Sequence, residues 1–205
     1  MPVTIDGTTG ITTPGETNTG NLSVAGSTTL TTPLPVASGG TGAATLAGAN
    51  IPAVNATNTF TATQTFTGTS SAKAIVLTDA AEVATVSATA ATGTINYDIT
   101  TQSVLYYTSN ASANWTVNFR ASSGTSLNTL MATGESVTVA FLVTQGSTAY
   151  YNNVVEVDGS TVTPKYQGGT AYAAGNASSI DVYMYTIIKT GNAVFTVFTS
   201  QTKFA

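Results

Sequence analysis

The sequence predicts an all-β protein, in which an extended N-terminal arm and shaft precede an antiparallel β-sandwich that is either jelly-roll-like or Ig-like. Only 7% of the 205 residues are charged, against roughly 25% in ordinary soluble domains, and Thr, Ser, Ala and Gly dominate. Because β-branched side chains lose rotamer freedom in helices and fit pleated sheets, this composition favours strands and turns. Aromatic residues begin at Phe60, and alternating segments fill the chain from Lys73 onward.

The chain divides into three predicted parts: an extended arm over residues 1–37, a glycine turn with a short shaft over 38–78, and a C-terminal sandwich over 79–205. The arm has an aliphatic residue every few positions between Gly and Pro, but no aromatic side chain. Such a segment buries too little apolar area to offset its chain entropy, so it should not fold alone. A disordered linker is one interpretation. The other, which we favour, is an extended chain packed on symmetry mates.

Residues 38–78 begin with a glycine cluster, where positive φ angles allow a sharp change of direction. The alanine-rich stretch 43–53 is compatible with one short helix that ends at Pro52, although it contains a glycine. Two copies of Thr-Phe-Thr follow, centred on Phe60 and Phe66. Two copies are too few for a solenoid, but they fit one turn of a fibre shaft with both rings facing a common axis.

Period-2 alternation predicts the strands of the sandwich, with Trp115, Val117 and Phe119 pointing to one face. One helical turn is expected within 126–133, where Ser126 can cap the first turn. We expect about eight short strands in total, which is typical of a sandwich. The clearest strand segments are 115–120, 137–143, 150–157, 161–163, 181–189 and 194–198.

Two links between these strands have the residues of tight hairpin turns. Asp158-Gly159 predicts a type I′ turn, since both central residues tolerate positive φ. Gly191-Asn192 predicts a type II′ turn, which needs glycine at its first central position. Both turns would join neighbouring antiparallel strands.

The composition argues against an enzyme and against several classes of partner. Without Cys or His, the chain has no disulfide, thiolate nucleophile, usual zinc site or histidine base. The net charge of -4 is spread singly, and no Lys/Arg cluster predicts a nucleic-acid partner. No secretion signal or long apolar run is visible, so we expect a soluble protein without membrane insertion. No cofactor is expected.

The best acidic pair is Glu156 and Asp158, which lie two positions apart. General acid–base catalysis would also need a pocket that raises one pKa, and a turn role before Gly159 explains Asp158 better. A weak calcium site is the other alternative for these carboxylates. We therefore predict no catalytic residue and no metal ligand.

Tyrosines are the remaining candidates for binding, because an aromatic face offers apolar contact to a sugar ring. Most of them should lie in the core or in a subunit interface. We expect any contact with a host glycan at Tyr166, Gly168, Gly169 and Tyr172, because the two glycines let this loop protrude.

Seven short motifs occur after residue 127: LMATG at 130–134, VTQGSTAYY at 143–151, VTPK at 162–165, QGGT at 167–170, SIDVY at 179–183, YTIIKT at 185–190 and SQTKFA at 200–205. Together they resemble the module that closes virion structural proteins and fibres of marine phages, especially cyanophages. The turn Ser-Gly-Gly-Thr-Gly-Ala at 38–43 is similar to one that recurs in phage tail-fibre chains. The module often has Trp where this chain has Tyr166, and Pro where it has Tyr172. Neither change should disturb a sandwich.

The resemblance implies a virion component that is assembled in the host cytoplasm. We expect a homotrimeric tail fibre, in which residues 1–37 anchor to other virion proteins and the C-terminal sandwich contacts a glycan or protein of the host surface. The alternative is a capsid decoration or head-fibre protein whose arm lies across capsid subunits. A polysaccharide depolymerase is disfavoured, because the sequence has no evident pair of carboxylates for a catalytic cleft.

Overall fold

The computed structural model describes residues 57–78 and 80–205, and the chain divides into two units, Met1–Ile75 and Val76–Ala205. The predicted arm at 1–37, the glycine turn and the short helix at 43–53 lie outside the described residues. The first strand of the second unit begins at Ala84.

The described part of the first unit, residues 57–75, is extended chain with exposed side chains. One turn interrupts it, where Thr69 and Ala72 exchange backbone hydrogen bonds of 3.0 and 3.4 Å. Phe60 and Phe66 remain 50% and 59% exposed within the chain. Phe60 and Phe66 were predicted to face the common axis of a fibre shaft. That axis would be formed with other copies of the chain, so this stays a prediction.

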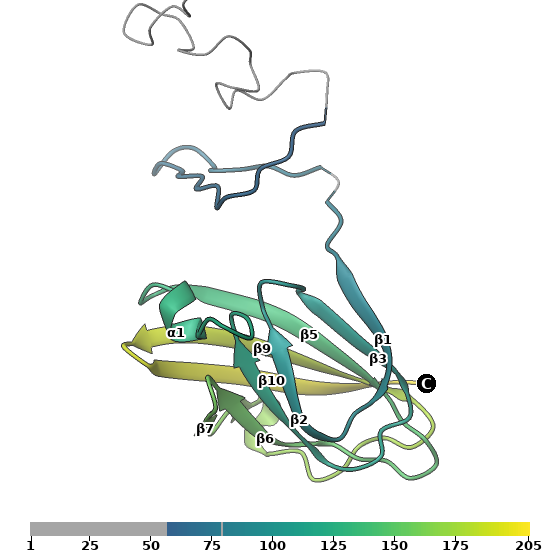
Figure 1. Cartoon of the computed structure of the whole chain (residues 1–205). Coiled ribbons are helices and arrows are strands. Elements are labelled where there is room, and N and C mark those ends of the chain that lie inside the picture. Colours follow the sequence, from purple (N-terminus) through teal and green to yellow (C-terminus); the bar gives the residue numbers. More distant parts are fainter. Residues whose placement is uncertain (1–56, 79) are drawn as a thin grey trace, which may run out of the picture. The chain divides into compact units, whose positions relative to one another are not determined.

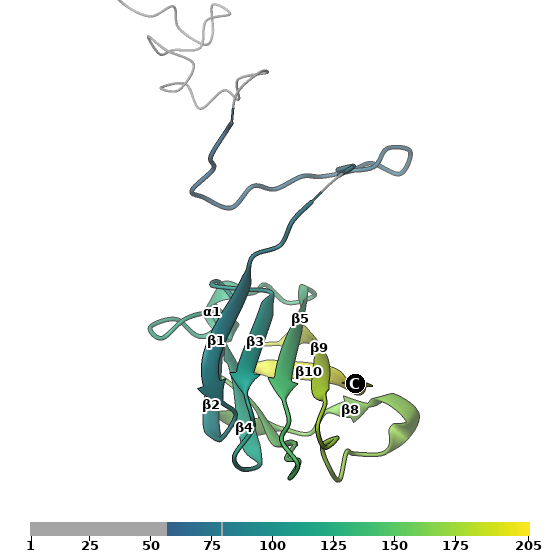
Figure 2. The same cartoon turned by 90° about the vertical axis from the view of Figure 1, so that its right-hand side faces the viewer.

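The second unit consists of two β-sheets. The six-stranded sheet contains β1 (Ala84–Ala90), β3 (Val104–Ser109), β5 (Ser136–Thr144), β8 (Lys165–Tyr166), β9 (Ile180–Gly191) and β10 (Val194–Phe204). The four-stranded sheet contains β2 (Gly93–Asp98), β4 (Trp115–Arg120), β6 (Asn152–Val157) and β7 (Ser160–Val162). The spatial orders are β1-β3-β5-β9-β10-β8 and β2-β4-β6-β7. Figure 2 shows β1, β3, β5 and β9 side by side in the larger sheet.

The chain alternates between the two sheets from β1 to β6, and each return places a strand beside its predecessor in the same direction (Figure 1). Thus β1, β3 and β5 pair in parallel in one sheet, and β2, β4 and β6 pair in parallel in the other. The β9–β10 hairpin then joins the larger sheet, with β9 antiparallel to β5. The first half of the domain is therefore a winding rather than a series of hairpins.

The prediction of an all-β fold is confirmed for the described residues, but antiparallel pairing is wrong for most of their strand pairs. Antiparallel pairs are β5–β9, β9–β10 and β6–β7, while β8–β10 and the four pairs within the winding are parallel. The physical reason is that period-2 alternation reports which face a side chain occupies and is independent of strand direction. The sequence pattern therefore predicted the strands from Trp115 onward, apart from the short β8, without their pairing.

Aromatic side chains from both sheets meet in one core. The rings of Trp115 and Phe141 are 6.1 Å apart, and those of Trp115 and Tyr183 are 5.4 Å apart. Phe119 contacts Tyr185 at 4.8 Å. Each of these pairs joins the four-stranded to the six-stranded sheet in an edge-on arrangement favoured by the ring quadrupoles. The predicted inward face of strand 115–120 is confirmed, because Trp115, Val117 and Phe119 are all buried.

The predicted type I′ turn at Asp158-Gly159 is confirmed. Both residues have positive φ, 52° and 76°, and they join β6 to the antiparallel strand β7. The Asp158 carboxylate also accepts hydrogen bonds from the backbone N–H groups of Leu127 and Asn128, at 2.6 and 2.9 Å. These residues begin α1 (Leu127–Leu130), whose N-terminal cap is Ser126, as predicted. One side chain thus connects the hairpin to the helical turn.

We expect Asp158→Ala to lower the free energy of unfolding by about 1–2 kcal/mol, because two backbone donors lose their acceptor and alanine is strained at positive φ. Asp158→Asn should cost less, since an asparagine oxygen can still accept and asparagine tolerates this backbone region. Urea unfolding of the three proteins measures the difference. Equal losses for both variants would contradict the capping role.

The predicted type II′ turn at Gly191-Asn192 is wrong. Gly191 does not have positive φ and instead ends β9, whereas Ala193 has a φ of 52°. Gly191 pairs with Val194, so the two-residue loop is Asn192-Ala193, and the register shift between Val194 and Phe195 places a bulge beside it. The Ala193 N–H donates to the side-chain oxygen of Asn128 at 2.7 Å, a tertiary contact absent from the local sequence pattern.

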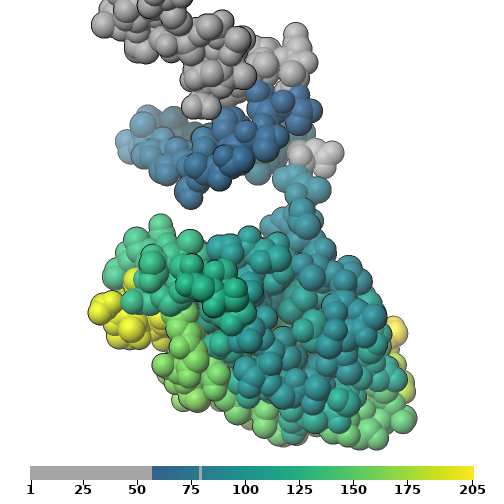
Figure 3. All heavy atoms as spheres, in the orientation of Figure 1, coloured from purple at the N-terminus to yellow at the C-terminus, as the bar shows by residue number. Residues whose placement is uncertain are grey.

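The helical turn α1 lies against the tip of the β9–β10 hairpin, where green and yellow atoms meet in Figure 3. Lys189 on β9 is buried and donates from Nζ to the carbonyl oxygens of Asn128 and Met131, at 2.6 and 2.8 Å. This places a cation at the C-terminal end of α1, where carbonyl groups lack partners within the helix. The contact closes one end of the domain.

Candidate functional site

The four residues predicted to contact a glycan lie between β8 and the return to β9. Tyr166 ends β8, and Gly168 and Gly169 lie in the 3₁₀ turn η2 (Gln167–Gly169), with φ angles of 75° and 79°. No atom lies within 4 Å of where a Cβ would stand on either glycine. Both glycines are exposed, so the loop protrudes, and only residues without a side chain adopt this backbone without strain.

Tyr172 has a structural position that the loop prediction did not anticipate. Its ring contacts Tyr166 edge-on at 5.0 Å and Tyr183 at 5.5 Å, and its hydroxyl forms a hydrogen bond with Thr199. The stack therefore runs from the loop into the core. Tyr166 and Tyr172 are both half-buried, and Tyr172 lies between Tyr166 and the fully buried Tyr183.

Burial raises the pKa of several of these phenols above the ordinary value of 10.0. For Tyr172 and Tyr183 loss of water contact is the largest cause, and the nearby Asp181 carboxylate raises the pKa of Tyr183 further. Burial also raises the pKa of Tyr185 well above 10.0, and that of Tyr166 in the same direction. All four phenols are neutral at ordinary pH and can donate hydrogen bonds.

These raised pKa values predict alkaline unfolding of the domain. Below pH 10 the folded and unfolded chains bind the same phenolic protons, so the stability from neutral burial is fully present. Above pH 10 the unfolded tyrosines ionise, with an ordinary pKa of 10.0, while the buried ones do not, so stability falls as pH rises. Tyr185→Phe should make this fall less steep. Tyrosinate absorbance followed together with circular dichroism tests it. Full ionisation of all tyrosines in a folded domain would contradict the prediction.

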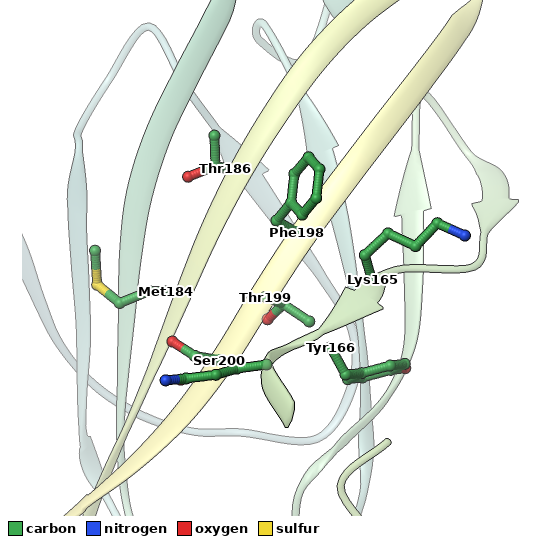
Figure 4. Close-up of a pocket in the computed structure, with 8 residues that line it drawn as sticks. Lys165, Tyr166, Met184, Thr186, Phe198, Thr199 and Ser200 are labelled. Atoms are coloured by element: carbon green, nitrogen blue, oxygen red, sulfur yellow. The ribbon is translucent and has the colours of Figure 1, made fainter. Parts of the chain in front are cut away.

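A pocket of about 300 Å³ opens beside Tyr166 on the outer face of the six-stranded sheet (Figure 4). Phe198 lies between Thr186 of β9 and Lys165 of β8, its register partners. Phe198 is 46% exposed, and Met184, also in the pocket, is 38% exposed. The lining residues are Lys165, Tyr166, Gln167, Met184, Thr186, Phe198, Thr199 and Ser200.

This lining combines an apolar floor with several hydrogen-bonding groups. A phenyl ring and a thioether offer apolar contact, while hydroxyl, amide and ammonium groups lie around them. Such a surface suits a sugar ring, which has apolar C–H faces and hydroxyl edges. Among the four predicted residues, Tyr166 lines the pocket and Gly168, Gly169 and Tyr172 do not. Contact with a glycan stays a prediction, and Phe198 and Met184 become additional candidates for it.

A buried carboxylate, Asp181, organises the loops beside this region. Asp181 is completely buried and accepts from the side-chain amides of Gln145 at 3.1 Å and Gln201 at 3.3 Å. Asn176 donates both its backbone N–H, at 3.0 Å, and its side-chain amide, at 2.6 Å. All these donors are neutral. The arrangement uses the full acceptor capacity of a carboxylate to fix three segments of chain, and it makes Asp181 a structural residue.

The acidic pair has separate roles in the structure. Glu156 occupies an outward position on β6, while the Asp158 carboxylate is committed to α1. Within residues 57–78 and 80–205, no three Asp or Glu side chains come close enough to hold a metal ion. Over the same ranges, no helix has the length and apolar character needed to cross a membrane.

Comparison with known proteins gave no match to a family model, to a curated protein or to a solved structure.

Proposed function

We propose that this chain is a non-catalytic structural protein of a phage virion, most simply a homotrimeric tail fibre. The observation that carries an assembly role is the exposed apolar segment before the domain. Five apolar side chains in this segment are at least half exposed within the chain, and the most exposed, Val76, reaches 73%. They are Phe60, Phe66, Ile75, Val76 and Leu77. Isolated exposed apolar residues are ordinary, but a succession of them along extended chain favours coverage by other protein surfaces.

The phage assignment is supported by the motifs of segment 127–205, which resemble the C-terminal module of marine phage virion proteins. The structure places most of that segment in one domain with a shared aromatic core, from α1 to β10. A compact β domain that follows a low-charge extended segment is a suitable architecture for a fibre tip. In this proposal residues 1–37 anchor the chain to other virion proteins, and the domain contacts the host surface through the pocket beside Tyr166.

Labelled antibody on intact particles tests the proposal. For a tail fibre, we expect label on the fibres and a mass of three times 20.7 kDa for the purified protein in light scattering. Label spread over the capsid lattice would replace the fibre with the alternative, a capsid decoration or head-fibre protein. Particles without label would overturn both. Incubation with host envelope glycans should release no fragments, and any turnover would contradict the non-catalytic role.

A further inference from the structure

The outer face of the six-stranded sheet carries no charge on five of its strands. The outward positions of β1, β3, β5, β9 and β10 contain no Asp, Glu, Lys or Arg. Charged residues do occur on β9 and β10, but Asp181, Lys189 and Lys203 all occupy the alternate positions. Lys165 on β8 marks the edge of this face through its pairing with Phe198. We call the outward side of these five strands the uncharged face.

The uncharged face is continuous across the sheet. The strand register aligns two rows of outward residues, one running Val86, Tyr106, Leu142, Val182 and the other Ala84, Val104, Ala140, Met184. Each row crosses four neighbouring strands, so that apolar side chains adjoin from β1 to β9. Two Thr hydroxyls, of Thr138 and Thr186, hydrogen bond to each other at 3.0 Å and so satisfy part of the polar surface between strands.

The outer face of the four-stranded sheet has the opposite character. Asp98 and Arg120 form an ion pair there at 2.5 Å, and Asn118 donates to Asn96 at 2.8 Å in the neighbouring row. Glu156 follows at the next strand of that row. This is the polar, charged surface that a sheet normally presents to water. The contrast within one domain shows that the low overall charge alone does not account for the uncharged face.

We propose that the uncharged face is the surface through which the C-terminal domains of the copies of this chain associate around their common axis. The inference rests on the homo-oligomer of the proposed function and names its contact surface. Two uncharged faces can lose their water without leaving a charge unpaired, whereas a charged partner would have to be desolvated against them. Every further copy around the axis necessarily presents the same surface.

The size of the face fits this role. Five strands of about 4.8 Å width and about seven residues at 3.3 Å each give roughly 24 by 23 Å, on the order of 550 Å² in projection. Standard interfaces bury about 800 Å² of accessible surface per partner, and accessible surface exceeds projected area because side chains stand out from the sheet. The face can therefore supply most of one standard interface. The pocket beside Tyr166 shares the outward residues Met184, Thr186, Phe198 and Ser200 with this face. The contact between copies is therefore centred on the Val182 row and on β1, β3 and β5, and the pocket lies at the β8 border of the face.

A matched pair of substitutions in the full chain tests the proposal. Val182 on the uncharged face and Val154 on the opposite sheet are both outward, half-buried strand residues. We expect Val182→Lys to raise the dissociation constant of self-association by about a hundredfold or more, because its ammonium group would be buried without a partner. Val154→Lys should leave association unchanged. Sedimentation of the folded proteins over a range of concentrations measures both. Equal association of the two variants would overturn the proposal.

A second measurement keeps the test decisive if Val182→Lys fails to fold. The chain has no cysteine, so a single introduced thiol can be labelled selectively. Val86 is 65% exposed in one chain, so slow labelling of Val86→Cys by a maleimide would require coverage by another copy. Thr94→Cys on the outward face of β2 should label at least about tenfold faster, since it stays in water. Equal rates, or a wild-type protein that stays monomeric, would overturn the inference. Antibody labelling of particles is independent of both outcomes, so failure of the proposed function would be seen separately.

Discussion

Replacing Phe141 with alanine should lower the free energy of unfolding of the C-terminal domain by about 3–5 kcal/mol. Phe141 is fully buried on β5, and its ring lies 5.2 Å from Tyr107, 6.1 Å from Trp115 and 6.4 Å from Tyr97. Truncation would remove contacts with both sheets at once and leave a cavity between rigid rings that cannot close. Trp115 is the only tryptophan, so its fluorescence reports urea unfolding of this core directly.

Phe66→Ala is the matched control for this experiment. Phe66 lies in the first unit and is 59% exposed, so its removal should change the domain's unfolding free energy by less than about 0.5 kcal/mol. A loss below about 1 kcal/mol for Phe141→Ala would show that the two sheets do not pack through this ring. The interpretation of the core as one aromatic cluster would then be wrong.

Asp181→Asn should lower the free energy of unfolding by about 3 kcal/mol, although it replaces only one oxygen of the side chain with nitrogen. The Asp181 carboxylate accepts four hydrogen bonds, three from side-chain amides and one from the backbone N–H of Asn176. An asparagine would direct an NH₂ group at one set of these donors, which removes an acceptor and leaves buried polar groups unsatisfied. Urea unfolding measures the loss, and faster hydrogen exchange at the Asn176 amide should accompany it.

The control is the same substitution at Asp98, whose carboxylate pairs with Arg120 on the outer surface. The Asp98 and Arg120 side chains are 27% and 26% exposed, so Asp98→Asn should cost about 1 kcal/mol or less. If both substitutions cost the same, burial of Asp181 would not be the source of its effect.

The strands from Trp115 onward, apart from the two-residue β8, could be predicted from the sequence, whereas β1, β2 and β3 were missed. Trp115 and Phe119 alternate with polar neighbours, so their strand appears clearly in the pattern. The segment Ala84–Ala90 reads ATVSATA and has little contrast between its faces, yet it forms β1 because it pairs with β3. Its structure is set by a neighbour, which a local pattern does not contain.

Strand direction and tertiary polar contacts could not be predicted either, because they also depend on residues that are distant in the sequence. The turn at Asp158-Gly159 could be predicted because its backbone preference is local, whereas the turn residue Ala193 has positive φ and donates its N–H to Asn128, a distant residue. Asp181 and Lys189 did carry a usable signal. Both charges lie at the inward positions of an alternating strand, and a buried charge must be hydrogen bonded.

The predicted glycan loop was placed correctly as a protrusion, but its two tyrosines have different surroundings. Gly168 and Gly169 indicated an exposed turn, which the structure contains. The sequence could not show that Tyr172 continues the core stack through Tyr183, because this is a tertiary contact between a loop residue and a residue of β9. Phe198 and Met184 were missed as pocket residues, since an alternating strand does not reveal which outward positions adjoin a hollow.

The winding of β1 to β6 has a consequence for the order of folding. Parallel neighbours such as β1 and β3 cannot meet as a tight hairpin, so their pairing must wait for closure of longer loops. By contrast, β9 and β10 are joined by a short turn and can pair early once both have been synthesised. Tyr183 and Tyr185, which complete the core, come from this late hairpin. During translation the two sheets should therefore remain open until the chain has emerged through β10, and this is when a chaperone would find the most exposed apolar surface.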